Sequence, residues 1–348
     1  MVANTKLPVH TKAAVNTLDV IVDLQYGDSG KGKVAHFLCK EVKYTHVLRY
    51  NGGCNAGHTI FHNGKKFVTH HIPAGVFFGV KSIIGSGCVV DPVQFFAEIK
   101  MLEEGGVDTK GKIFIAKNAH VITDAHKAED KAKGAAIGTT GRGNGPAYRD
   151  KYGRTGVRAE QVEELKPYLI DLYDEWYSKG DVTVLGEGAQ GFGLDIDWGD
   201  YPFVTSSHCT TAGALLNGLA PQTVRDVWGI AKIYETYVGS KKFQPEDAIF
   251  DKIGDLGEEF GATTGRRRQT NWLNVQTMER AIRMNGVNKL VINKVDILNK
   301  LGVWNVIDNE KVIPFKSSDE MKQYIRDRMK PLGINPENIF FSESAETV

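Results

Sequence analysis

The first stretch whose residue types could do chemistry is a glycine-rich run at residues 27–33, Gly-Asp-Ser-Gly-Lys-Gly-Lys. It follows an apolar segment, and its spacing matches a phosphate-binding P-loop, in which glycines let backbone N–H groups face phosphate at the start of a helix. The Ser or Thr that binds magnesium in such loops is missing, because Val34 stands there. Asp28 is the only carboxylate in the run, so we expect it to hold the metal. An ordinary strand-to-helix turn is the alternative.

Three later runs carry residues that suit a nucleotide. Residues 51–59 contain His58, which could donate a proton or hydrogen bond to a transferring phosphoryl group, although a lone loop histidine is by default structural. Residues 138–146 combine hydroxyls, backbone amides and a guanidinium, which together suit a monophosphate. Residues 187–191 present the amide of Gln190, which could read the edge of a base.

Two runs near the end of this series complete the set. Residues 260–268 end in three consecutive arginines, which could clamp a small dicarboxylate through paired hydrogen bonds. A solvated basic patch is the alternative reading. Residues 293–296, Asn-Lys-Val-Asp, resemble the guanine-reading tetrapeptide of GTPases, although so short a match can arise by chance.

Composition narrows the class of protein. Basic and acidic residues number 43 and 42, so no basic surplus points to a nucleic-acid partner. No apolar run reaches membrane-spanning length, which predicts no membrane partner. The four cysteines have no metal-type spacing. Residues 1–17 lack an apolar signal segment and are expected to form a loose tail. These features predict a cytoplasmic location.

The elements that position these loops alternate along the chain. β-Branched runs predict strands at residues 18–24, 46–49, 82–84, 113–116, 182–185, 227–233, 290–292 and 339–341. Helices are predicted from a cap at Asp91 through residue 104, and at residues 159–179, 275–285 and 318–330. Such alternation predicts an α/β fold: one large domain over residues 18–348, with a mainly parallel central sheet covered by helices and a P-loop-like nucleotide-binding topology. Ligands bind at the carboxyl ends of parallel strands, where the glycine-rich loops would gather.

Taken in order, these runs resemble the signatures of the adenylosuccinate synthetase family. The matching runs are residues 27–33, 55–59, 137–148, 187–190, 201–207 and 261–268. The resemblance implies a homodimeric, Mg²⁺-dependent ligase that phosphorylates the 6-oxygen of a purine monophosphate and then displaces the phosphate with the amino group of aspartate. Asp28 would be the base and, with the backbone of Gly57, a magnesium ligand, and His58 would assist phosphoryl transfer.

The resemblance also assigns binding residues. The purine monophosphate would be held by Ser29, Asn55, Thr140, Gln190, Thr205, Val238, Arg266 and Arg154 of the partner subunit. Aspartate would be held by Thr264, Arg266 and Arg268. The triphosphate would be held by Gly27, Gly30, Lys31, Gly32, Lys33, Gly57, His58, Thr59, Asn293, Lys294 and Asp296.

The chain departs from the usual family pattern at a few positions. Ser29 replaces a Glu, which leaves room beside the base for the 2-amino group that distinguishes guanine from hypoxanthine. Tyr237 replaces an Arg, residues 239–244 replace a Gly-Pro-rich stretch, and Gln269 replaces a fourth Arg. Residues 342–348 lack the Thr-Gly-Pro segment that helps enclose the guanine of GTP, so ATP or its deoxy analogue becomes the expected donor.

This combination is similar to the bacteriophage branch of the family, whose members join aspartate to deoxyguanosine monophosphate (dGMP) on the route to 2-aminoadenine for viral DNA. The alternative is a conventional adenylosuccinate synthetase that uses IMP and GTP. A nucleotide-dependent switch is a third class, which Val34 and the arginine-rich loop disfavour.

Overall fold

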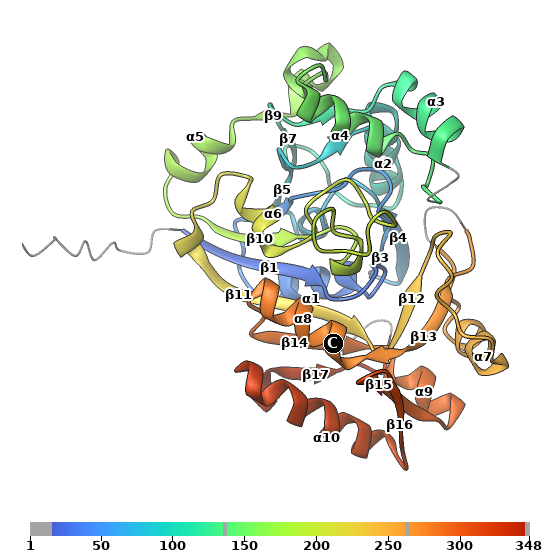
Figure 1. The fold of residues 1–348 in the computed structure, drawn as a ribbon. Helices are drawn as coiled ribbons and strands as arrows, with labels where there is room; N and C mark the ends of the chain where they lie inside the picture. Colours follow the sequence, from blue (N-terminus) through green and yellow to red (C-terminus); the bar gives the residue numbers. More distant parts are fainter. Residues whose placement is uncertain (1–15, 135–137, 262–264, 345–348) are drawn as a thin grey trace, which may run out of the picture.

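A computed structural model describes residues 16–134, 138–261 and 265–344. Its centre is a nine-stranded sheet in the order β17-β14-β11-β1-β10-β2-β5-β7-β9 (Figure 1). Every neighbouring pair in it is parallel. The strands are β1 Thr17–Asp23, β2 His46–Arg49, β5 Lys81–Ile84, β7 Ile113–Ala116, β9 Leu169–Ile170, β10 Thr183–Glu187, β11 Val224–Lys232, β14 Lys289–Asn293 and β17 Ile339–Phe341. The predicted parallel sheet and its eight predicted strands are confirmed.

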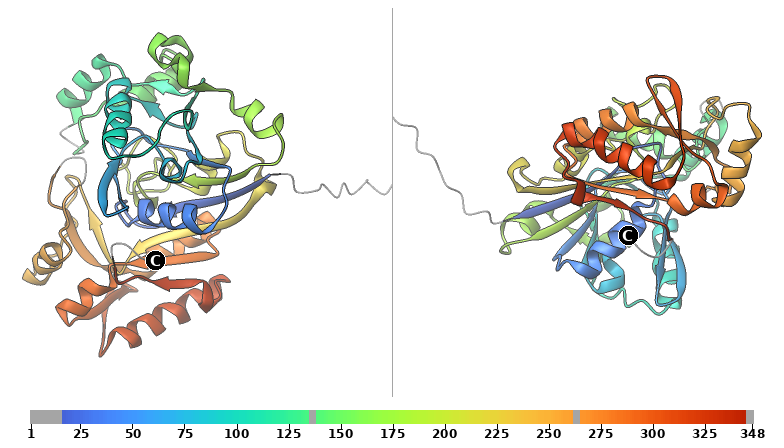
Figure 2. Two further views of the ribbon diagram at one scale, coloured as in Figure 1. Left: turned by 180° about the vertical axis from the view of Figure 1, so that it is seen from behind. Right: turned by 90° about the horizontal axis from the view of Figure 1, so that it is seen from below.

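Helices cover both faces of this sheet. Helix α1, Lys31–Glu41, lies on one face, and α8, Val275–Asn285, and α10, Ser318–Met329, lie on the other (Figure 2). The α8 helix buries Met278, Ala281 and Ile282, whose spacing places them on one side of a helix. Because both faces are covered, the central strands are buried almost throughout.

The remaining elements surround the sheet. The other helices are α2 Pro92–Glu104, α3 Asp124–Lys133, α4 Asn144–Gly153, α5 Leu172–Tyr177, α6 Thr211–Leu215, α7 Ala248–Leu256 and α9 Val295–Leu301. A second sheet has the order β12-β13-β15-β16, with β12 Tyr234–Tyr237, β13 Gln269–Asn274, β15 Trp304–Asp308 and β16 Lys311–Phe315. Two strand pairs complete the fold: β3 His58–His62 with β4 Lys65–Thr69, and β6 Val89–Val90 with β8 His120–Val121. None of the described helices is long and apolar enough to cross a membrane.

The helix predicted at residues 159–179 is wrong. The chain there forms two short 3₁₀ helices, Ala159–Gln161 and Glu163–Tyr168, then the edge strand β9 and the short helix α5. Pro167 has no N–H to continue a helix, and Asp171 starts a new one by accepting hydrogen bonds from the N–H groups of Tyr173 and Asp174.

The predicted boundary of the loose tail at residue 17 is also wrong. Thr17 begins β1, and Asn16 is buried before it. The Asn16 side chain donates to the carbonyl of Trp176 at 2.8 Å and accepts from the N–H of Val182 at 3.2 Å. Residues 1–15 lie outside the described part of the chain.

If Asn16 anchors the first strand, Asn16→Ala should lower the free energy of unfolding by about 2 kcal/mol, because a buried N–H and a buried carbonyl lose their partners. Urea denaturation would measure the change. The matched control is Asn335→Ala, an exposed asparagine that caps no N–H group, with an expected change below about 0.5 kcal/mol. Equal changes in the free energy of unfolding for the two variants would show that Asn16 does not anchor the first strand.

Candidate active site

The first glycine-rich loop is built around the carboxylate of Asp23, the last residue of β1. Asp23 is buried and accepts hydrogen bonds from the backbone N–H groups of Gln25, Gly27 and Ser29 at 3.0, 3.3 and 3.1 Å. It also accepts from the Ser29 hydroxyl at 3.0 Å and the Lys31 ammonium at 2.9 Å. Five donors on one carboxylate determine the path of the loop, with alternate N–H groups turned inward.

The loop leads into the uncapped start of α1. No side chain caps the helix at Gly30, so the N–H groups of Lys31, Gly32 and Lys33 have no partner within the helix. Gly32 must be a glycine, because an added Cβ would lie 2.9 Å from the Cβ of His58. An open helix start beside a glycine-rich loop suits phosphate, as the sequence predicts.

Asp28 stands at the exposed tip of this loop and is paired with Arg268. Its Oδ2 accepts from Arg268 Nε at 3.0 Å, and Arg268 Nη1 donates to Glu259 Oε2 at 2.6 Å. Glu259 is buried and also accepts from Lys232 Nζ at 2.9 Å and the Tyr234 hydroxyl at 2.6 Å. Burial raises the pKa of Glu259, but Lys232 and Arg268 outweigh it and hold the pKa at about 2. A buried anion therefore orients Arg268 toward the predicted base.

His58 lies buried between a carboxylate and a guanidinium. Its Nδ1 pairs with Glu187, and the Arg49 guanidinium faces both ring nitrogens, with Nη1 3.1 Å from Nε2 and Nη2 3.1 Å from Nδ1. Because a carboxylate only accepts, the Nδ1 that meets Glu187 carries a proton. Burial and Arg49 lower the pKa of His58 to about 4, so the ring is neutral at pH 7. Both ring nitrogens are engaged, and His58 would have to leave this pair to meet a phosphoryl group.

Three amide side chains meet at Asn55, those of Asn55 and Gln190 from two loops and that of Asn144 from the start of α4. Asn55 Oδ1 accepts from Gln190 Nε2 at 2.9 Å and from Asn144 Nδ2 at 2.7 Å. The Gln190 Oε1 atom is buried and has no hydrogen-bond partner in the described part of the chain. An unsatisfied buried acceptor is costly, so a ligand N–H group would be stabilised there. The structure thus brings together two residues predicted to hold the purine monophosphate.

Arg266 joins the arginine-rich loop to the predicted monophosphate loop. Its guanidinium donates to the carbonyls of Thr139 at 2.7 Å and Gly138 at 3.3 Å, beside the half-buried Thr140. Two other predicted contacts, Thr205 and Val238, are half-buried as well. Arg154 is exposed at the end of α4, and Thr264 lies outside the described residues.

The two lysines of the first loop have different surroundings. Lys31 is buried, and its ammonium binds Asp23 and the Gln190 carbonyl, so in this structure it braces the loop. Lys33 donates to the Ser342 hydroxyl at 2.7 Å and the Ser344 carbonyl at 3.0 Å. Burial and the charge of Lys294 lower the pKa of Lys33 to about 8.

The predicted triphosphate residues at the end of β14 are held within the chain. Asn293 Nδ2 donates to the Ser29 carbonyl at 2.7 Å, which connects β14 to the first loop. Lys294 donates to the Gly257 carbonyl at 2.9 Å, and Asp296 pairs with Lys300 at 2.8 Å. Gly57 and Thr59 are also predicted to hold the triphosphate. Both are half-buried where the chain enters β3.

The residues predicted to hold magnesium suit it in chemistry. Asp28 offers an exposed carboxylate, and Gly57 offers backbone oxygen, both hard oxygen ligands. Mg²⁺ is normally held by one or two carboxylates together with phosphate oxygens and water. Because Asp28 is paired with Arg268, metal binding there requires that pair to open.

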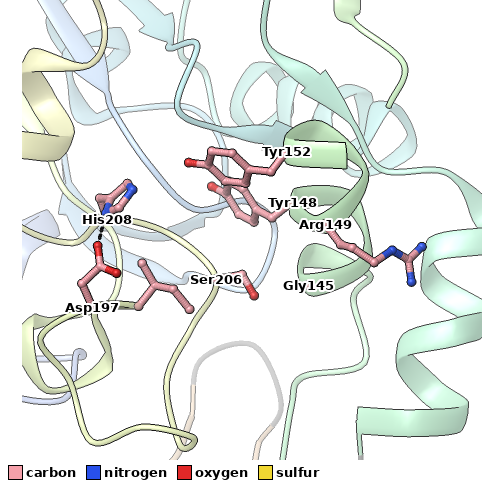
Figure 3. A pocket seen from close by; sticks show the side chains of 8 residues that line it. Gly145, Tyr148, Arg149, Tyr152, Asp197, Ser206 and His208 are labelled. Atoms are coloured by element: carbon pink, nitrogen blue, oxygen red, sulfur yellow. Dashed lines mark ion pairs between the residues drawn. The ribbon is translucent and has the colours of Figure 1, made fainter. Parts of the chain in front are cut away.

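A cleft of about 370 Å³ lies between α4 and the segment at residues 196–208 (Figure 3). Tyr148 and Tyr152 of α4 face His208 and Asp197 across it. Its described lining residues are Gly145, Tyr148, Arg149, Tyr152, Ile196, Asp197, Ser206 and His208. His208 and Asp197 could form a cation site with Asp195, but both Asp195 oxygens already accept backbone N–H groups, which identifies a loop-bracing role.

The sequence analysis did not identify several residues of the site, although most of them share a recognisable sequence feature. Each of these is the polar last residue of a buried parallel strand, at the edge where ligands bind. The missed residues are Asp23, Arg49, Glu187 and Lys232. Asn293, which was predicted as a site residue, has the same position at the end of β14. Glu259 had no comparable signal, because it lies in a loop beyond α7.

Comparison with known proteins agrees with this geometry. The sequence model of the family described as adenylosuccinate synthetase matches residues 20–172 and 159–312. The adenylosuccinate synthetase of Chlorobium limicola is 40% identical over 339 residues, covering 81% of this chain and 77% of the relative. That of Bacteroides fragilis is 40% identical over 365 residues, covering 88% and 85%.

Two solved structures share the fold. Fully ligated adenylosuccinate synthetase from Plasmodium falciparum superposes with a TM-score of 0.79 at 23% identity, covering 94% of this chain and 97% of that one. Succinoaminodeoxyadenylate synthetase of cyanophage S-2L, bound to dGMP and dATP as an energy donor, superposes with a TM-score of 0.72 at 22% identity, covering 95% and 94%. The chain therefore belongs to the adenylosuccinate synthetase family and is a carbon–nitrogen ligase.

Proposed function

We propose that this enzyme joins L-aspartate to dGMP with ATP, giving succinyl-2-aminodeoxyadenylate, ADP and phosphate, on a route to 2-aminoadenine DNA. The reaction has two steps. The 6-oxygen of the purine takes the γ-phosphoryl group of ATP as the ring N–H proton passes to Asp28. The amino group of aspartate then attacks C6, and phosphate leaves with the former 6-oxygen. Phosphorylation turns a poor leaving group into a good one.

The described residues fit these steps. Asp28 is exposed at the loop tip, and the open start of α1 lies directly after it to receive phosphate. Arg268 binds the carboxylates of Asp28 and Glu259, and it can exchange that of Asp28 for a carboxylate of aspartate. This exchange would free Asp28 when aspartate arrives. Bound at Asp28 and Gly57, Mg²⁺ would offset the negative charge that develops on the phosphates.

The observation that carries the choice of dGMP is the placement of Ser29. Its hydroxyl turns inward to Asp23 at 3.0 Å and Gln25 at 3.2 Å, and the residue is 1% exposed. The Glu that the family usually carries here would meet the buried carboxylate of Asp23, so it would have to turn outward. With Ser29, no side chain from this position extends beside Asp28, which favours a base with an extra 2-amino group.

The choice of ATP rests on the C-terminal run. Ser342 and Ser344 contact Lys33 of the first loop, so this run lies beside the predicted triphosphate site. It lacks the family segment that encloses a guanine. The cyanophage structure that shares this fold holds dGMP and a deoxyadenosine triphosphate, the same pairing of bases. Residues 345–348 are outside the described part of the chain.

The second candidate is conventional synthesis of adenylosuccinate from IMP, aspartate and GTP. It is favoured by relatives at 40% identity that carry this name, and by the retained residues 293–296. Against it, the Asn293 amide donates to the Ser29 carbonyl and Asp296 pairs with Lys300. Both side chains are thus engaged within the chain rather than turned to a guanine.

We further propose that the enzyme acts in the cytoplasm as a homodimer in which Arg154 serves the neighbouring subunit. Arg154 is exposed, and its backbone N–H closes α4 on the Lys151 carbonyl, while no described interaction engages its guanidinium. It follows α4, whose Tyr152 is 63% exposed beside the open cleft. A second copy packed on this face would cover the tyrosine and bring Arg154 of the partner subunit toward a bound monophosphate.

The decisive experiment offers dGMP and IMP in separate reactions with Mg²⁺, aspartate and either ATP or GTP. Product masses identify what is joined. We expect a succinylated product from dGMP with ATP and little from IMP, and Ser29→Glu should reverse part of that preference. Product from IMP alone would establish the conventional reaction and leave Ser29 as a tolerated substitution.

A pair of variants tests whether Arg268 binds aspartate through its guanidinium or only contributes positive charge to the loop. Arg268→Lys keeps the charge but cannot reach Asp28 and Glu259 together, so the KM for aspartate should rise roughly 30-fold. The neighbouring variant Arg267→Lys is the control, because Arg267 is exposed and pairs with Asp251 and Asp255 of α7. Its expected change is below about threefold. Equal effects of the two variants would contradict the assignment.

Sedimentation velocity tests the dimer. The protein should sediment at twice the monomer mass, and Arg154→Leu should raise the KM for the purine monophosphate by roughly tenfold or more without changing that mass. A fully active monomer would rule out a contribution from a second subunit.

A further inference from the structure

Gln269, the first residue of β13, holds the segment at residues 239–244 (the selectivity segment) with both ends of its amide. Its Oε1 accepts from the N–H groups of Phe243 at 2.8 Å and Gln244 at 3.0 Å. Its Nε2 donates to the carbonyls of Lys241 at 2.8 Å and Gly239 at 3.4 Å. An arginine at this position has donors only and could not accept the two N–H groups. Gln269 and the selectivity segment therefore form one unit.

The selectivity segment touches the predicted monophosphate loop on one side. A Cβ added at Gly138 would lie 2.8 Å from the Ser240 nitrogen and 3.2 Å from the Gly239 Cα. Backbone thus packs against backbone, and Arg266 ties the same loop down through the carbonyls of Gly138 and Thr139. No additional group therefore fits between the two backbone segments.

On its other side the selectivity segment reaches the loop that bears Asp28. The Lys241 ammonium lies over three rings, 4.6 Å from the centre of Tyr26, 5.0 Å from Tyr237 and 5.5 Å from Phe243. It also pairs with Asp200, which accepts from the Tyr26 hydroxyl at 2.8 Å. Desolvated cation–π contacts of this kind hold a segment firmly. Tyr26 immediately precedes Gly27, so the segment is fixed to the base side of the site.

The geometry of a nucleotide places its sugar between these two contacts. Its phosphate belongs at the loop of Thr140 and its base beside Asp28 and Gln190, so the ribose must lie between them, where Val238 leads into the selectivity segment. We propose that Gln269 is a positioning residue that makes the enzyme reject ribose in favour of 2′-deoxyribose. It does so by holding the segment as a rigid wall that leaves no space for a 2′-hydroxyl. This inference rests on the proposed function for the placement of the nucleotide.

The test compares kcat/KM for deoxyribo and ribo forms of one base, dGMP against GMP and dIMP against IMP. The wild type should prefer the deoxy form. In Gln269→Ala the preference should fall roughly tenfold, mainly through a lower KM for the ribo substrate, because a loosened wall admits the hydroxyl. A merely structural loss would lower both activities together. Gln269→Glu keeps the two acceptor bonds and should retain part of the preference.

Gln276→Ala is the matched control. Gln276 also uses both ends of its amide, donating to the Asn309 side chain at 2.8 Å and accepting from the Asn309 N–H at 3.1 Å, but it is exposed on the outer face of α8. Its deoxy preference should equal that of the wild type. If Gln269→Ala does not fold, Lys241→Met removes the caged cation and should lower the preference in the same direction.

The outcomes separate the two proposals. A wild type that uses IMP but not dGMP contradicts the proposed function, yet the dIMP-to-IMP ratio still tests the role of Gln269. A wild type without sugar preference, or a preference that Gln269→Ala and Lys241→Met leave unchanged within about twofold, overturns the inference.

Discussion

The carboxylate of Asp23 is the constraint on which the site depends. It is buried at the end of the central strand, and a buried anion must be satisfied by donors. Five donors from the residues that follow, Gln25 to Lys31, bind it. The loop is therefore pulled inward at alternate residues, which leaves Asp28 at its exposed tip and the first N–H groups of α1 open. The same anion takes the hydroxyl of Ser29 away from the site.

Paired charges then connect loops that are far apart in the sequence. Arg268 joins Asp28 to the buried Glu259, and Arg49 and Glu187 hold His58 in a neutral form. Such pairs are costly to desolvate, so their value lies in orientation more than in stability. Both predicted catalytic groups are engaged with partners of their own chain. On the proposed function, substrate carboxylates and phosphates would compete for those partners, which would couple binding to release of the catalytic groups.

Chemistry and selectivity are carried by different parts of the fold. The polar ends of parallel strands supply the charged groups, and these lie on the most rigid elements of the molecule. On the proposed function, the selectivity segment, Gln269 and Ser29 would supply shape at the margin of the same site. None of these departures from the usual family pattern replaces the last residue of a parallel strand, whereas Ser342 and Ser344 follow β17 and contact Lys33. A change of substrate could thus arise without disturbing the groups that perform the transfer.

The sequence by itself determined where the main strands lie, that they form a parallel α/β fold, and which loops form the candidate site. Local patterns suffice for these features, because buried strands need apolar side chains and phosphate loops need glycines. It failed at residues 159–179, where Pro167 and Asp171 outweigh the helical pattern. The inward turn of Ser29, the Arg268–Asp28 pair, the neutral state of His58 and the four bonds of Gln269 were decided only by the tertiary structure. Each of them depends on a partner brought close by folding, and nothing in a linear sequence states which buried donor meets which acceptor.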